Sequence, residues 1–109
     1  MKIAGIPFDV TDWSQVEAVV HPGETGTATW RTRQLGEIRV RLIEYSPGYR
    51  ADHWCARGHV ILVLDGVLDT EIQGGPVHTL TAGMVYHVAD DEAPHRSSTT
   101  GGARLFIVD

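Results

Sequence analysis

Frequent turn signals divide this chain into short pieces, and they constrain its fold more than any other feature. Twelve glycines and five prolines are scattered through 109 residues. The pair Pro47-Gly48 indicates a turn, and Asp65-Gly66 indicates a hairpin. Helical periodicity is almost absent, and the one segment that fits a helical turn, 11–17, is too short to carry a fold. The chain is therefore predicted to be all-β.

The segments between the turns alternate in the way that half-buried strands do. In 25–35, the side chains of Ala28, Trp30 and Thr32 fall on one face. The almost wholly apolar segment 59–64 is predicted to be buried on both faces, with the hairpin signal returning the next strand against it. Strands are expected at 16–21, 25–35, 38–45, 50–55, 59–64, 67–72, 77–80, 84–89 and 103–108. Short, evenly spaced strands of this number are typical of a sandwich or a barrel.

Length and charge favour one domain that does not bind nucleic acid. A chain of 109 residues with 42% hydrophobic residues can build one core, so a single domain over 1–109 is expected. The formal net charge of −5 opposes binding to nucleic-acid phosphates. The one local basic cluster comprises Arg31, Arg33, Arg39 and Arg41. Because these arginines alternate along two strands, we expect them on a solvated outer face.

Cysteine content and the N-terminal segment predict a cytoplasmic protein. Cys55 is the only cysteine, so an intrachain disulfide is impossible, and a lone thiol is typical of a reducing compartment. The segment 1–9 has no long apolar run before an acidic residue arrives. Neither a signal peptide nor a membrane span is therefore expected there, and no membrane partner.

Three histidines and the cysteine form the most informative chemical pattern. His53 and Cys55 are two residues apart, which in an extended strand points both side chains to the same side. His59 and His95 would then come from neighbouring strands. Three imidazoles and a thiolate suit a divalent transition metal, zinc best, with iron, nickel or copper also compatible with imidazole.

The four residues predict different chemistry according to the role of Cys55. With all four bound, the site would be a closed structural one, whereas three histidines alone would leave positions open for metal-bound water or oxygen chemistry. Each residue also has a simpler interpretation. A buried cysteine often acts as a small hydrophobe, His59 would fit a hydrogen-bonded core, and His95 would fit a loop.

Two spaced motifs resemble those of the cupin superfamily. The first spans about 48–66, from Gly48 through His53, Cys55 and His59 to Gly66, and the second spans about 83–95. Cys55 stands where the family has a second histidine, and His59 where it has glutamate. The run from Asp52 to Cys55 also resembles a small bacterial subgroup, the DHCW-motif cupins.

The resemblance implies a fold and a range of activities. The implied fold is a single-domain jelly-roll β-barrel, or double-stranded β-helix, with an N-terminal extension. Cupins carry out oxygenation, isomerisation or decarboxylation, so we expect a metal-dependent enzyme acting on an unidentified small molecule in the barrel. The alternatives are a non-catalytic metal or small-ligand binding module and a metal-free structural cupin. Trp30 and Tyr86 are candidates for lining the cavity, and a homodimer is expected because sheet edges need covering.

Overall fold

The computed structural model describes residues 2–109, and its regular secondary structure consists almost entirely of strands. One 3-10 turn, η1 (Trp13–Gln15), is capped by the Asp12 side chain, which accepts a hydrogen bond from the backbone N–H of Ser14. Eight strands follow: β1 (Ala18–Pro22), β2 (Thr27–Leu35), β3 (Ile38–Tyr45), β4 (His59–Ile72), β5 (Val77–Thr81), β6 (Val85–Val88), β7 (His95–Ser98) and β8 (Ala103–Val108). The all-β prediction is confirmed. Within residues 2–109, no helix has the length and hydropathy to cross a membrane.

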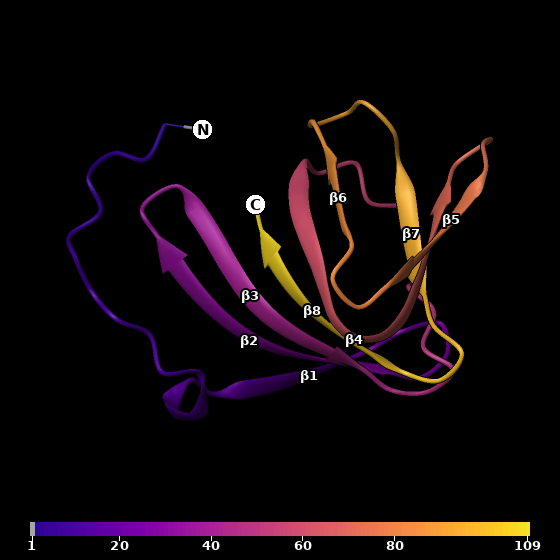
Figure 1. Cartoon of the computed structure of the whole chain (residues 1–109), viewed down its shortest axis with the longest axis horizontal. Helices are drawn as coiled ribbons and strands as arrows, with labels where there is room; N and C mark the ends of the chain where they lie inside the picture. The colour runs from indigo at the N-terminus through magenta and orange to yellow at the C-terminus, as the bar shows by residue number, and fades with distance from the viewer. Residues whose placement is uncertain (1) are drawn as a thin grey trace.

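The strands form two antiparallel layers that share one long strand. The larger layer has the order β1-β2-β3-β8-β4-β6, and the smaller layer places β5 and β7 on either side of β4. The first half of β4 pairs with β8 and β6, and its second half pairs with β5 and β7. Figure 1 shows β4 curving from one layer into the other. The result is a rolled antiparallel barrel, which confirms the predicted jelly-roll architecture.

The hairpin predicted at Asp65-Gly66 is wrong, because β4 runs through this pair without reversing. The register against β8 shifts between Val63 and Asp65, so the strand bends there. Gly66 has a positive φ of 78°, and a Cβ at this position would lie 2.1 Å from the carbonyl oxygen of Gly102. The glycine therefore permits a bend and a close backbone approach within one strand rather than a chain reversal.

The core lies between the two layers and uses only one side of the larger one. Its most deeply buried side chains are Ile43, Ile61, Val63, Leu68 and Leu105. The prediction that 59–64 is buried on both faces is wrong: Val60 and Leu64 are each 41% exposed on the outer side. The outer face of this part of β4 thus carries apolar side chains that are only partly buried.

The arginines do not share one solvated face. β3 pairs with β2 so that Arg41 lies opposite Thr32 and Ile43 opposite Trp30, which places Arg39 and Arg41 on the inner side of the layer. Arg41 is 5% exposed. The prediction of a solvated outer face is therefore wrong for Arg39 and Arg41. The outer side of β3 carries apolar residues instead, namely Ile38, Val40 and Leu42.

Arg31 and Arg33 do lie on the outer side, where they hold the N-terminal segment. A guanidinium nitrogen of Arg31 donates to the carbonyls of Trp13 and Val16, and Arg33 pairs with Asp9 at 3.3 Å. Figure 1 shows the N-terminal segment running outside β2 and β3. These contacts explain how an extension without its own core stays against the barrel.

Candidate metal centre

Cys55, His59 and His95 converge inside the barrel. Their potential ligand atoms all lie within 4.8 Å of one another. His59 is the first residue of β4 in the larger layer, and His95 is the first residue of β7 in the smaller one. Cys55 is joined to His95 by two backbone hydrogen bonds, of 2.7 and 2.9 Å, which form an isolated bridge. Three donors from three separate segments thus meet where the two layers face each other.

His53 lies at the edge of this group. Its side chain is 75% exposed, and its Nδ1 lies 2.6 Å from a carboxylate oxygen of Asp52. The segment around it bends between the bridges at Arg50 and Cys55, so the alternation of a regular strand does not apply. His53 nevertheless lines the same cavity as Cys55. The structure therefore brings three of the four predicted ligands together and leaves His53 outside that cluster.

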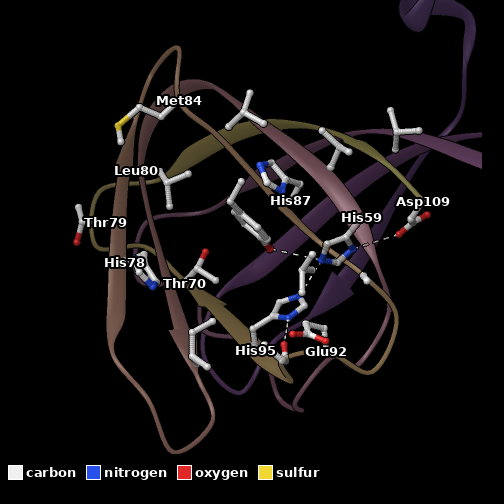
Figure 2. A pocket seen from close by; sticks show the side chains of 18 of the residues that line it. His59, Thr70, His78, Thr79, Leu80, Met84, His87, Glu92, His95 and Asp109 are labelled. Carbon is white, nitrogen blue, oxygen red and sulfur yellow. Dashed lines mark hydrogen bonds and ion pairs between the residues drawn. The ribbon is translucent and has the colours of Figure 1, made fainter. Parts of the chain in front are cut away.

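The two buried imidazoles are oriented by acceptors on their outer nitrogens. His95 Nδ1 lies 2.7 Å from the carbonyl oxygen of Ala93, and His59 Nδ1 lies 3.5 Å from Asp109 Oδ2. Because a carbonyl and a carboxylate can only accept, each Nδ1 carries a hydrogen, so each Nε2 of a neutral ring presents a lone pair. The two Nε2 atoms lie 2.7 Å apart (Figure 2). Two facing lone pairs at this distance repel, so the pair requires either a proton shared between the nitrogens or a cation that both nitrogens contact from one side.

The thiol and the imidazole of His95 shift each other's protonation. When both nitrogens of His95 are protonated, the hydrogen bond from this ring lowers the pKa of Cys55, although partial burial opposes this shift. The same hydrogen bond raises the pKa of His95. The pair therefore favours the thiolate, which is the form of cysteine that binds metals.

Asp109 anchors His59 from behind and was not anticipated from the sequence. Its carboxylate accepts two hydrogen bonds from Arg39, at 2.8 and 3.0 Å, and one from Arg41 at 2.7 Å. Burial alone would raise the pKa of this carboxyl, but hydrogen bonds from His59 and Arg39 and the charge of Arg41 hold that pKa well below its usual range. The sequence does contain a pattern that indicates its inward direction: Asp109 shares a strand face with Leu105 and Ile107, which are buried.

Two hollows meet at the cluster. One, of about 290 Å³, is lined by Cys55, His59 and His95 together with both predicted wall residues, Trp30 and Tyr86. The other, of about 980 Å³ (Figure 2), lies toward β5 and β6. His59, Tyr86 and His95 belong to the walls of both. The Tyr86 hydroxyl lies 3.4 Å from His59 Nε2, and burial raises the pKa of this phenol. The hollows give a small molecule room beside the three donors.

The donor set fits a metal ion. One thiolate and two imidazoles form a borderline-soft combination, and three protein donors leave at least one coordination position for water or a ligand. The acceptors behind both imidazoles are the outer contacts that metal-binding histidines usually make. The chemistry of the residues present is therefore that of an open transition-metal site.

Comparison with known proteins identifies the fold by structure and not by sequence. No family model matches the sequence, and no curated protein matches it. An RmlC-like cupin from Shewanella frigidimarina is similar with a TM-score of 0.77 at 18% identity, covering 94% of this chain and 90% of that one. Ectoine synthase from P. lautus gives 0.73 at 14% identity, covering 93% and 76%. A sugar phosphate isomerase of the cupin superfamily from Silicibacter pomeroyi gives 0.69 at 19%, covering 92% and 74%.

These similarities agree with the strand order described above and with the two spaced motifs of the sequence. The first two of these proteins match more than nine-tenths of this chain. The chain therefore has the cupin fold, with Cys55, His59 and His95 gathered in the interior of its barrel.

Proposed function

We propose that the protein binds a divalent transition metal through Cys55, His59 and His95 and uses it on a small molecule in the adjoining cavity. The observation that carries this proposal is the convergence of one thiol and two imidazoles within 4.8 Å, with each imidazole turned so that its Nε2 faces the group. Zinc is the favoured ion because it accepts mixed thiolate and imidazole donors. Iron and nickel are the alternatives that imidazole also serves.

A bound ion would act as a Lewis acid or activate a water molecule at its open position. The chain's own residues have separate roles in such a site. Asp109 and the Ala93 carbonyl fix the two imidazole rings, and Tyr86 offers a hydroxyl beside His59. The enzyme names of two similar structures, ectoine synthase and sugar phosphate isomerase, support small-molecule chemistry on this fold without identifying a substrate.

His53 is the candidate for a fourth ligand. It lines the cavity that contains the cluster, and its exposed side chain is free to turn away from Asp52. A site that His53 completes would be closed and would suit a non-catalytic binding module, whereas a site without it keeps an open position. The role of His53 thus separates the enzymatic proposal from the binding-module alternative.

Elemental analysis of protein purified without a polyhistidine tag tests the proposal. We expect about one metal ion per chain, lost in both His95→Ala and Cys55→Ser and retained in His87→Ala, whose side chain is exposed on β6. Retention of metal in His53→Ala would support the open three-residue site. Wild-type protein without stoichiometric metal, even after reconstitution, would instead leave a hydrogen-bonded, metal-free cluster.

A further inference from the structure

We propose that the smaller hollow binds a small organic anion, with a carboxylate or phosphate group held by Arg41 and Arg39 beside the cluster. This inference rests on the proposed function for the chemistry done to the anion, but its binding requires only the arginines. The hollow of about 290 Å³ is at the lower end of ligand-pocket sizes, which limits the occupant to a small molecule.

The wall of this hollow carries an excess of positive charge. Arg39, Arg41, Arg57 and Arg96 line it, and no aspartate or glutamate does. Asp109 lies behind the wall and pairs with both Arg39 and Arg41. Arg96 pairs with Glu71, which is shared with Arg50. Four guanidinium groups thus face two carboxylates and the thiolate of Cys55. In a protein of net charge −5, this concentration of positive charge is a local field that attracts anions.

Arg41 has an unused hydrogen-bond donor in a place that water hardly reaches. Its side chain is almost completely buried, and its Nη2 donates to Asp109. Its Nε has no hydrogen-bond partner among residues 2–109. Leaving a charged donor unpaired in a buried position is costly, so such groups normally have a partner. Because Arg41 lines the hollow, an anion there would give this guanidinium group a partner that the protein does not supply.

The two arginines are held in position by an aromatic ring. The guanidinium carbon of Arg41 lies 4.5 Å from the centre of the Trp30 ring, and that of Arg39 lies 5.7 Å from it. Asp109 fixes Arg39 through two further hydrogen bonds. Guanidinium groups that are already ordered lose little entropy on binding, and their planar donors match a carboxylate or phosphate. The arginines of the hollow are therefore preorganised to bind an anion.

The arginines and the three metal-binding candidates are close enough to contact the same small molecule. Cys55, His59 and His95 line the hollow that the arginines line. An anionic group on Arg41 would leave the rest of a small molecule directed toward those three donors. The arginines would thus select the substrate class, and the cluster would supply the reactive centre.

Isothermal titration of the full chain with inorganic phosphate and with benzoate tests this inference and separates the two anion types. We expect one of the two to bind at one site per chain, more weakly as salt is raised. Arg41→Lys should weaken that binding about tenfold, the loss of a charge-assisted hydrogen bond. Arg57→Gln, at an exposed position where folding is not at risk, should weaken it about threefold through lost charge. Arg104→Gln, on the outer side of β8, should leave it unchanged.

Repeating the titration on wild-type protein treated with a chelator distinguishes failure of this inference from failure of the metal proposal. Anion binding should persist in the chelated protein, because the arginines do not depend on the metal. Absence of saturable binding of both probes overturns the inference. The inference is equally overturned if Arg41→Lys and Arg57→Gln bind the anion as tightly as Arg104→Gln does.

Discussion

At the residue scale, Asp109 connects the buried charges to the candidate metal centre. One carboxylate accepts from Arg39 and Arg41 and stands behind the imidazole of His59. Its side chain has no exposed surface. The same group therefore neutralises buried guanidinium charge and orients a candidate ligand, so its loss should affect both stability and metal binding.

Asp109→Asn should lower the free energy of unfolding by about 3–5 kcal/mol, because it leaves the buried Arg41 charge without its counterion. It should also weaken metal binding by about tenfold or more, since an amide fixes the His59 ring less firmly. Urea denaturation and metal titration measure the two effects. Asp65→Asn, at an exposed position of β4, is the matched control and should change stability by less than about 0.5 kcal/mol. Equal stability of the two variants would contradict the role assigned to Asp109.

The sequence indicated the clustered residues better than it indicated their surroundings. Spacing and the cupin resemblance pointed to Cys55, His59 and His95, which lie together. The inward direction of Arg41 was missed because alternation normally puts apolar residues inside, and here buried Asp109 compensates the charge. That compensation joins positions 68 residues apart in the chain, a pairing that local patterns do not encode.

At the element scale, β4 determines how the site is assembled. Its first half carries His59, and its second half pairs with β7, which begins at His95. The bend at Gly66 makes this possible within one continuous strand. The turn signal at this pair was genuine, but glycine serves bends and reversals equally, so local sequence could not distinguish them.

Gly66→Ala tests the bend, and Gly48→Ala is its matched control. Both residues have nearly equal positive φ, 78° and 77°. A Cβ on Gly48 would meet nothing within 4 Å, whereas one on Gly66 would collide with the Gly102 carbonyl. We expect Gly48→Ala to cost about 1–2 kcal/mol from backbone strain alone, and Gly66→Ala to cost clearly more. Thermal unfolding measures both, and similar losses would argue against the close approach.

At the scale of the whole molecule, the outer face of the larger layer remains partly uncovered. Val60 and Val85 are 41% and 49% exposed there, and Val40, Leu42 and Phe106 lie on the same side of neighbouring strands. Apolar residues facing out along successive strands are typical of a surface that another chain covers. We therefore retain the homodimer as a prediction, with a second copy on this face.

Light scattering coupled to size exclusion checks this prediction. We expect wild-type protein to have the mass of two chains and Val85→Lys that of one, because a buried lysine disfavours the contact. Val77→Lys places the same charge at an exposed valine of β5, outside this face, and should remain dimeric. A monomeric wild type would contradict the prediction, as would two variants that behave alike.

Metal binding should also change the stability of the whole barrel. An ion that binds only the folded chain stabilises it by about 2.7 kcal/mol at a hundredfold excess over its Kd, which raises the melting temperature by about 10 °C for a domain of this size. Scanning calorimetry with zinc and with a chelator measures the shift. His95→Ala should melt at the same temperature under both conditions, and a shift that persists in this variant would place the ion elsewhere.

The short β7 has a consequence for local motion. It pairs with β4 over four residues and meets segment 50–55 only at isolated bridges, whereas β8 lies between β3 and β4 along its length. An ion held by His95, Cys55 and His59 would tie this weakly bonded strand to the opposite layer. Amide protons of β7 should then exchange with solvent slowly only in the metal-loaded protein, while those of β8 stay protected throughout. Metal occupancy would thus govern how often one side of the barrel opens.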